Sequence, residues 1–357
     1  MPPVRENEVK RVRLTSQVTR RPVCDWVGGP RRHQAFIIRL HVSLTTTTSR
    51  TVNLTLKMEN STKKIALALA VVGVSVIVGL VSVFMKKKKR PIALDPKKKI
   101  PFKLIEKEHI SHDTRRFRFA LQSSEHILGL PIGNHLYLSA RIDGKLVIRP
   151  YTPTTLDDSI GYFDLVIKVY FKNVHPRFPD GGKMSQHLET LEIGDTIDVR
   201  GPSGHIFYNG CGSFSMRESG QPENKVSCKE VGMIAGGTGI TPMLQIIQAV
   251  FSNKNDMTKM YLLFANQTEE DILVRERLEE LAAQNPEQLK VWYTLDRPPT
   301  DWSYSSGFIN EDMILGHMPS ASKDSIVLMC GPPPMLEYAC IPNLKKAGFD
   351  ENSYFAF

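Results

Sequence analysis

Hydrophobic and polar positions follow three different patterns along the chain. Residues 65–85 form an apolar run of 21 residues without a single charge, which as a helix is about 31 Å long and enough to cross a bilayer. Between residues 101 and 205, short runs of β-branched and aromatic residues alternate with Gly, Pro and Asp. Beyond residue 230, apolar runs of strand length alternate with helical patterns. These patterns predict a transmembrane helix, then an antiparallel β barrel, then an α/β domain with a parallel sheet.

The same patterns predict the individual elements. In the β part, four strands and one short helix are expected at 135–144, 145–153, 163–171, 195–202 and Ser185–Leu191. In the α/β part, strands are expected at 231–235, 259–266, 289–296 and 325–331, and helices at 242–251, 272–284, 310–318 and 335–348. Residues 206–229 are polar and carry Gly, Pro and Ser, so we expect an interdomain linker there. The two domains are therefore expected at 101–205 and 230–357.

The formal net charge of +9 would suggest a nucleic-acid-binding protein if the basic residues lay in the folded part of the chain. Residues 1–64 carry +9 and residues 86–100 carry +7, whereas residues 101–357 carry −7. The basic charge therefore flanks the apolar run, residues 86–100 are a basic linker, and we expect no nucleic-acid partner. Nine Lys and Arg lie within 86–105 against four within 45–64, so the positive-inside rule places the C-terminal domains in the cytosol.

The N-terminal segment before the apolar run gives no clear signal of structure. It is rich in Arg, Ser and Thr and shows no convincing helix or strand pairing, so residues 1–64 are expected to be an unstructured basic extension. A mitochondrial transit peptide is the alternative, although Glu6, Glu8 and Asp25 argue against it. Met58 would also be a natural start just before the anchor. The five cysteines are scattered without a CxxC pair, which excludes a disulfide scaffold and a zinc site.

Three motifs lie at the ends of the predicted parallel strands. Gly236-Gly-Thr-Gly-Ile-Thr-Pro242 joins the first strand to its helix, where glycines and free N–H groups suit the phosphates or nicotinamide end of a dinucleotide. Asp296 ends the third strand and can accept hydrogen bonds from a ribose diol while repelling a 2′-phosphate; the alternative is a solvated turn residue. Cys330 begins a Cys-Gly-Pro-Pro-Pro-Met turn, and the alternative role for it is a small buried hydrophobe.

Two motifs of the β part also suggest a ligand. Arg149-Pro-Tyr-Thr-Pro153 brings a guanidinium, a phenol and a hydroxyl to a strand end, where Arg149 suits a phosphate and Tyr151 a flat ring. Gly181-Gly-Lys-Met-Ser185 opens the short helix and predicts a second anion-binding turn. A glycine turn with Ser185 as N-cap is the alternative for this motif.

Taken in order, the motifs RPYTP, GGKMS, GGTGITPM, YTLDRPP and CGPPPM resemble those of the NADH–cytochrome b5 reductase family of ferredoxin-reductase-like flavoenzymes. The resemblance runs from about Lys98 to Phe357 and does not cover residues 1–57. It implies an antiparallel FAD-binding barrel followed by a Rossmann-like, parallel-sheet NADH-binding domain. The implied activity is electron transfer from NADH through FAD to cytochrome b5. Alternatives are an NAD(P)H flavoreductase for a quinone or another haem protein, and a membrane-tethered binding protein without flavin.

The resemblance also implies roles for particular residues. For FAD it implies contacts with Arg149, Pro150, Tyr151, Thr152, Val166, Lys168, Phe171, Met184, Ser185, Thr241 and Phe357. For the nicotinamide cofactor it implies contacts with Gly237, Thr238, Cys330, Gly331 and Pro333, with Lys168 nearby and Asp296 favouring NADH over NADPH. Thr152, Thr241 and Cys330 would act at the reacting rings, the two threonines by stabilising charge on the reduced flavin and Cys330 by positioning the nicotinamide.

The resemblance finally implies a partner and a place in the cell. Cytochrome b5 is acidic, so docking would use basic residues near the flavin edge, with Lys183 matching a family docking position. We expect a monomer without a bound metal, anchored by residues 65–85 in the endoplasmic reticulum membrane or, as the alternative, in the mitochondrial outer membrane.

Overall fold

The computed structural model describes residues 37–40, 54–57 and 89–357, apart from residues 175, 177, 218, 219 and 221. Contacts between Cα atoms divide the chain into two compact units, Met1–Lys89 and Arg90–Phe357.

In the first unit, two short strands pair with one another. Strand β1 (Ile37–Leu40) runs antiparallel to β2 (Leu54–Lys57). Both strands lie within residues 1–64, which we expected to form an unstructured basic extension. The predicted transmembrane helix at 65–85 lies outside the described residues. Within the described part, no helix has both the length and the apolar character needed to cross a membrane.

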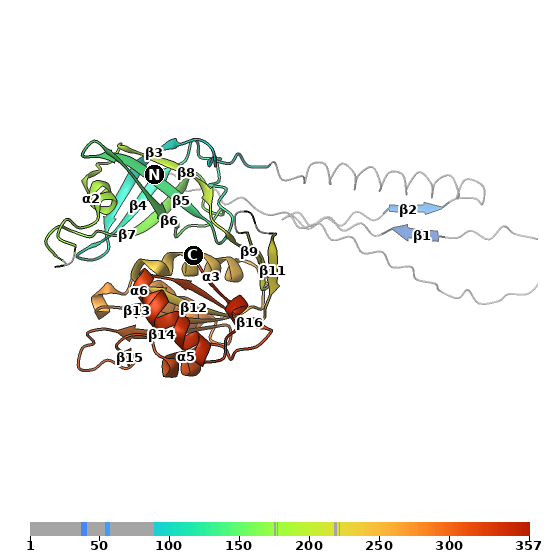
Figure 1. Cartoon of the computed structure of the whole chain (residues 1–357). Helices are drawn as coiled ribbons and strands as arrows, with labels where there is room; N and C mark the ends of the chain where they lie inside the picture. Colours follow the sequence, from blue (N-terminus) through green and yellow to red (C-terminus); the bar gives the residue numbers. More distant parts are fainter. Residues whose placement is uncertain are drawn as a thin grey trace, which may run out of the picture. The chain divides into compact units, whose positions relative to one another are not determined.

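An antiparallel sheet of six strands opens the second unit (Figure 1). Its strands lie side by side in the order β6 (Lys145–Tyr151), β5 (His135–Ile142), β8 (Thr196–Ser203), β3 (Ile100–His109), β4 (Thr114–Ala120) and β7 (Tyr162–Lys168). Among the described residues, no pairing joins the edge strands β6 and β7, so the predicted barrel is an open half-barrel. Helix α2 (Lys183–Thr190) contacts β5 and β6. The four predicted strands and the helix are confirmed, and β3 and β4 are additional.

The core of the half-barrel contains packed aromatic rings. Phe102, Phe119 and Phe163 are fully buried, and the ring of Phe163 lies 5.4 Å from each of the other two ring centroids. On the opposite face, the guanidiniums of Arg116 and Arg118 pair with Asp164. Alternate residues of β4 and β7 thus face the core and the ion pairs, which is the two-residue period of a strand with one buried face.

Residues 206–229, which we expected to be an interdomain linker, contain regular structure. They contain a three-stranded antiparallel sheet of β9 (Ile206–Gly210), β10 (Ser213–Met216) and β11 (Asn224–Ser227). The sheet forms because Ile206, Phe214 and Met216 are buried in the core of the α/β part. The polar composition of the segment comes from its turns and its exposed face.

A parallel sheet carries the last third of the chain, as predicted. Its strand order is β15 (Ser305–Ser306), β14 (Leu289–Leu295), β13 (Lys259–Asn266), β12 (Glu230–Gly236), β16 (Ser325–Cys330) and β17 (Tyr354–Ala356). The strands at its centre are buried on both faces. Helices α3 (Ile240–Ser252) and α4 (Arg275–Gln284) share one core, and α5 (Glu311–His317) and α7 (Ile341–Lys346) share the other. Helices therefore cover both faces of the sheet.

Helix α3 also joins the two domains, and in Figure 1 it lies on the side of the parallel sheet toward the half-barrel. The side chain of Gln245 is 1% exposed. Its Oε1 accepts a hydrogen bond from Gly133 N at 2.7 Å, and its Nε2 donates to Asn134 O at 3.4 Å. A second contact joins His205 Nε2 to Ala356 O at 2.9 Å. A buried amide with both ends hydrogen bonded fixes the orientation of the two domains.

Candidate functional site

The phosphate-binding candidate of the half-barrel lies on an open edge. Arg149 belongs to the edge strand β6, is exposed, and donates only to the neighbouring carbonyl of Ile148 at 2.8 Å. No acidic partner for Arg149 occurs among the described residues. A guanidinium without a carboxylate at a sheet edge is available for bidentate phosphate binding.

The start of α2 offers a second group of donors near the same edge. Gly182 precedes the helix without a side-chain cap, so the first-turn N–H groups lack intrahelical partners. The turn requires glycine at Gly181, which has φ +66° and whose Cβ would lie 2.4 Å from Tyr170 O, whereas a Cβ on Gly182 would meet the hydroxyl of Ser185 at 2.5 Å. The hydroxyl of Ser185 donates to Gly182 O at 3.1 Å and accepts from Tyr170 N at 3.2 Å. Ser185 is thus not the N-cap, and its backbone N–H, rather than its hydroxyl, is free for an anion.

The other residues implied for FAD lie at both edges of the antiparallel sheet. Val166 is buried and Lys168 half-buried on the second edge strand β7, and Phe171 follows half-buried. Tyr151 packs against the half-barrel core, and burial raises the pKa of its phenol, so it is neutral at physiological pH. Of the remaining implied residues, Met184 is buried, Thr152 is half-buried and Pro150 is exposed. The half-barrel thus brings a cation, an aromatic ring and a helix start to adjoining elements, which fits a flavin dinucleotide.

The glycine-rich turn after β12 lies directly against the end of β16. A Cβ on Gly239 would lie 2.0 Å from Cys330 O, so this close approach requires glycine. Gly237 has φ +52°, in the left-handed region, and no atom lies within 4 Å of its Cβ position. The loops that carry Thr238 and Gly331 are therefore neighbours. Adjacent loops at the carboxyl edge of a parallel sheet are the usual place for a dinucleotide.

The half-buried Cys330 is not a nucleophile in this setting. Burial raises the pKa of its thiol to about 11, so it stays protonated at neutral pH. A thiol reacts through its thiolate, whose fraction is negligible four units below the pKa. Pro333 begins α6 (Pro333–Met335) just after it. A neutral, half-buried thiol at this place can pack against a ligand without reacting with it.

Asp296 follows β14 at the same carboxyl edge. Its carboxylate is exposed, and its backbone N–H donates to Asn266 O at 3.0 Å. Partial burial raises the pKa of the carboxyl above its ordinary value, and the neighbouring Arg297 opposes this shift. No protein side chain accepts or donates to the carboxylate among the described residues, so it is available for ribose hydroxyls.

Asn266 is a candidate that we did not single out from the sequence. It ends β13, between the glycine-rich turn and Asp296, and is only 7% exposed. Within the described part of the chain, neither its Oδ1 nor its Nδ2 has a hydrogen-bond partner. A buried amide normally has its hydrogen bonds satisfied, so this pair of orphaned atoms is what a polar ligand at the strand end would satisfy. Its position at a strand end, followed by Gln267 and Thr268, was the only signal in the sequence.

Two further implied residues come from other elements. Thr241 is buried on α3, one turn before Gln245, so both lie on the helix face toward the half-barrel. Its hydroxyl donates to Thr238 O at 3.2 Å. Phe357 follows β17, and its N–H donates to Met329 O at 2.9 Å. Thr241 and Phe357 thus approach the domain junction from the parallel-sheet side.

Two family models match the antiparallel part and the parallel part of the chain separately. Residues 101–208 match the family model of an oxidoreductase FAD-binding domain, and residues 233–340 match that of an oxidoreductase NAD-binding domain. The chain is 56% identical over 293 residues to NADH-cytochrome b5 reductase 2 of Xenopus laevis, covering 81% of this chain and 99% of that protein. It is 52% identical over 302 residues to NADH-cytochrome b5 reductase 1 of Homo sapiens, covering 83% and 99%.

The solved structures add a match in three dimensions. The cytochrome b5 reductase domain of Ulva prolifera nitrate reductase superposes with a TM-score of 0.71 at 47% identity, covering 74% of this chain and all of that one. The sequence motifs, the two domains and these relatives agree, and the chain belongs to the NADH-cytochrome b5 reductase family.

Proposed function

We propose that this chain is a membrane-anchored flavoenzyme that oxidises NADH and reduces cytochrome b5. FAD, when bound, takes a hydride from NADH and releases the two electrons one at a time to a haem protein. The observation that carries the proposal is the order of the FAD-binding and NAD-binding domains in a chain 56% identical to an NADH-cytochrome b5 reductase. Comparing turnover with cytochrome b5 and with a soluble quinone tests the proposal. Faster turnover with the quinone would favour the flavoreductase alternative.

The half-barrel residues hold FAD in this proposal. The guanidinium of Arg149 and the first-turn N–H groups of Met184 and Ser185 bind the pyrophosphate. Tyr151 would contact the flavin, and its neutral phenol would serve as a hydrogen-bond donor. The remaining contacts are made by Pro150, Thr152, Val166, Lys168, Phe171 and Phe357. Arg149→Ala is expected to lower the FAD content of the purified protein, measured as flavin absorbance against protein absorbance. Full flavin content in that variant would contradict the assignment.

The residues at the carboxyl edge of the parallel sheet hold NADH. Asp296 accepts from the ribose hydroxyls and repels the 2′-phosphate of NADPH. Gly237, Thr238, Gly331 and Pro333 line the nicotinamide pocket, where the backbone approaches the ring closely because two of them lack a side chain. The orphaned amide of Asn266 supports a polar contact with NADH at the same edge.

Thr152, Thr241 and Cys330 act at the reacting rings without moving protons as an acid or a base. Thr152 and Thr241 would approach the flavin from the two domains and stabilise negative charge that develops there, for which the hydroxyl of Thr241 would exchange its hydrogen bond to Thr238 O for one to the flavin. Cys330 packs as a neutral thiol against the nicotinamide. Holding the two rings in contact supplies the proximity that a bimolecular hydride transfer lacks.

The docking surface for cytochrome b5 includes Lys183. This lysine is exposed at the start of α2, beside the proposed pyrophosphate site, and it has no ion-pair partner among the described residues. Lys183→Glu is expected to raise KM for cytochrome b5 about tenfold and to leave turnover with ferricyanide unchanged, because an acidic partner is repelled. Lys323→Glu is the matched control. Lys323 is also exposed, but it precedes the amino end of β16, whereas the proposed cofactor site lies at the carboxyl ends of the parallel strands. Equal effects of both variants would contradict a local docking site.

Residues 65–85 anchor the chain, with the catalytic domains on the cytosolic side. The uncharged run, the basic residues after it and the −7 balance of residues 101–357 support this topology. The full chain is expected to stay with membranes after alkaline carbonate extraction, and residues 91–357 alone to be released. Fractionation then distinguishes the endoplasmic reticulum from the mitochondrial outer membrane. Release of the full chain by carbonate would contradict the anchor.

A further inference from the structure

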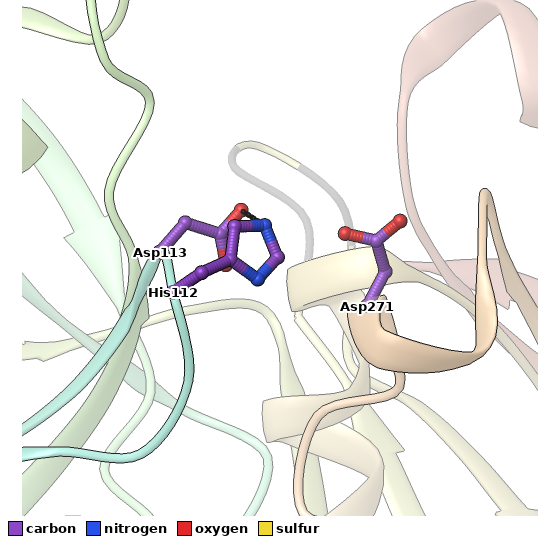
Figure 2. A group of neighbouring side chains, drawn as sticks. All are labelled: His112, Asp113 and Asp271. Atoms are coloured by element: carbon purple, nitrogen blue, oxygen red, sulfur yellow. Dashed lines mark ion pairs between the residues drawn. The ribbon is translucent and has the colours of Figure 1, made fainter.

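Two carboxylates and one ammonium meet where the FAD-binding and NAD-binding domains touch. Lys168 Nζ lies 2.6 Å from Asp113 Oδ2 and 2.5 Å from Asp271 Oδ1. Figure 2 shows Asp113 beside His112 on one ribbon and Asp271 facing them from the other domain. Lys168 and Asp113 belong to the FAD-binding domain, and Asp271 belongs to the NAD-binding domain. The Lys168–Asp271 pair is therefore a bridge between the domains.

The cation of this cluster is a side chain of the protein. The ligand atoms of His112, Asp113 and Asp271 lie within 4.8 Å of one another, a spacing that also suits a divalent metal ion. The ammonium of Lys168, however, is hydrogen bonded to one oxygen of each carboxylate. A metal ion between them would repel Lys168 and compete for the same oxygens. We therefore interpret the group as an ion-pair cluster and not as a metal site.

Both carboxylates are held in place by their own domains. Asp271 Oδ2 accepts from Thr268 N at 3.0 Å and from Thr268 Oγ1 at 2.8 Å, in a capping box of the turn η2 (Glu269–Asp271). Asp113 Oδ1 accepts from Thr114 Oγ1 at 3.1 Å. The carbonyl of Asp113 also accepts from Val169 N at 2.6 Å, next to Lys168. The ammonium therefore meets two oxygens whose positions are already fixed.

Burial and charge agree with a persistent pair. The side chains of Lys168, Asp113 and Asp271 are only 18%, 12% and 16% exposed. Burial lowers the pKa of Lys168, but its hydrogen bonds to Asp113 and Asp271 outweigh this and raise the pKa above its usual value. Burial likewise raises the pKa of Asp271, and hydrogen bonds from Lys168 and Thr268 reverse that shift. Both groups are charged at neutral pH, and solvent screens them less than a surface pair.

The pair lies toward the cofactor edge of the parallel sheet. Turn η2 follows β13, whose last residue is the orphaned Asn266. Lys168 ends β7, two residues after Val166, and both are proposed cofactor contacts. The Gln245 contact to Gly133 fixes the domains elsewhere, through α3. The Lys168–Asp271 pair adds a contact between the domains at the cofactor edge to those made by Gln245 and His205.

We propose that Asp271 is a positioning residue that, by holding Lys168, fixes the separation of the two domains at the cofactor edge. This separation sets the distance from the nicotinamide ring to the flavin ring, so the inference rests on the proposed function. Asp113 complements it by holding Lys168 from the FAD-binding side. Asp271 itself contacts neither ring in this proposal.

The test compares Asp271→Asn with Glu270→Gln in the full FAD-loaded chain. Both changes remove one negative charge from the same turn, but Glu270 is exposed and makes no side-chain hydrogen bond or ion pair with the other domain among the residues that the structure describes. The first readout is amide hydrogen exchange of residues 131–136, because Gly133 N donates to Gln245 across the interface. Exchange there is expected to be about tenfold faster in Asp271→Asn than in the control.

The second readout is anaerobic flavin reduction by NADH in a stopped-flow instrument. The limiting rate is expected to fall about tenfold in Asp271→Asn, within the roughly hundredfold that a 1 Å misplacement can cost. The apparent Kd for NADH is expected to change less than the limiting rate. Asp271→Glu, which keeps the charge, should restore at least part of both readouts. If Asp271→Asn does not fold, the comparison of Asp271→Glu with Glu270→Asp carries the test.

A double-mutant cycle with Lys168→Met isolates the pair. Since Asp271 acts through Lys168, adding Asp271→Asn to Lys168→Met should change neither readout further. Additive losses, or exchange and reduction equal to the Glu270→Gln control, would overturn the inference. A wild-type chain whose flavin NADH does not reduce would instead contradict the proposed function, so the two failures are distinguishable.

Discussion

Gly239→Ala tests the contact between the glycine-rich turn and Cys330. The added Cβ would lie 2.0 Å from Cys330 O and 2.5 Å from Cys330 C, and both are backbone atoms. Real Cβ contacts are at least about 3 Å, so the turn or the end of β16 must move by about 1 Å. A 1 Å misplacement of reacting groups costs about a hundredfold in rate, or roughly 2.7 kcal/mol. We therefore expect kcat/KM for NADH to fall about a hundredfold.

The assay uses ferricyanide as acceptor, so that docking of cytochrome b5 does not enter. Flavin absorbance should be unchanged, because the half-barrel residues proposed for FAD do not include Gly239. Gly316→Ala is the matched control, since this glycine of α5 has no atom within 4 Å of its Cβ position. A Gly239→Ala enzyme with kcat/KM close to that of the control would refute the assigned role of the turn.

Four further predictions test separate parts of the account. Asp296→Ser should shift the preference about tenfold toward NADPH, because a carboxylate facing a 2′-phosphate is removed; an unchanged ratio of kcat/KM values would show that Asp296 does not read the ribose. Asn266→Leu should weaken NADH binding about tenfold, since an amide with two hydrogen bonds to the ligand is lost, and titration calorimetry giving a wild-type Kd would remove Asn266 from the site. Asp256→Asn should lower the free energy of unfolding by about 2 kcal/mol at pH 7, because the carboxylate of Asp256 accepts from Tyr208, Thr258 and the Cys211 N–H. Burial raises the pKa of the Asp256 carboxyl, but these hydrogen bonds lower it below the ordinary 3.8, so the stabilisation by its carboxylate is present in full above that pH and is lost as the pH falls through the lowered pKa. In urea unfolding, the free energies of unfolding of wild type and Asp256→Asn should therefore converge in acid. A difference that stays constant down to pH 2 would contradict this. Cys330 should resist iodoacetamide at pH 7, since its thiol pKa is about 11, and rapid alkylation followed by peptide mass analysis would contradict a neutral thiol.

The regular elements could be predicted where one face or both faces are apolar. The strands of the parallel sheet were found because runs such as Val231–Ala235 are buried on both faces. Strands β3 and β4 were missed because their outer positions carry Glu106, Arg116 and Arg118, which pair with one another and dilute the apolar signal. The strands of segment 206–229 were missed because each is only four or five residues long and turn residues such as Gly and Pro separate them.

The site could be predicted only as far as it consists of local motifs. Arg149, the Gly236–Pro242 turn and Asp296 lie at strand ends and are visible as residue types at a spacing. Asn266 is a single polar residue, and only its burial without a partner indicates a role. The Lys168–Asp271 pair joins positions 103 residues apart, and no periodicity or motif connects them. Long-range ion pairs depend on how the domains meet, which the local pattern does not contain.

Anaerobic titration of the purified full chain is the most direct test of the central claim. NADH is added in steps to the FAD-loaded protein, followed by oxidised cytochrome b5, while the visible spectrum is recorded. One NADH is expected to bleach one flavin, and two molecules of cytochrome b5 per flavin are then reduced as the flavin colour returns. A protein that stays colourless with added FAD, or whose flavin NADH does not bleach, would contradict it.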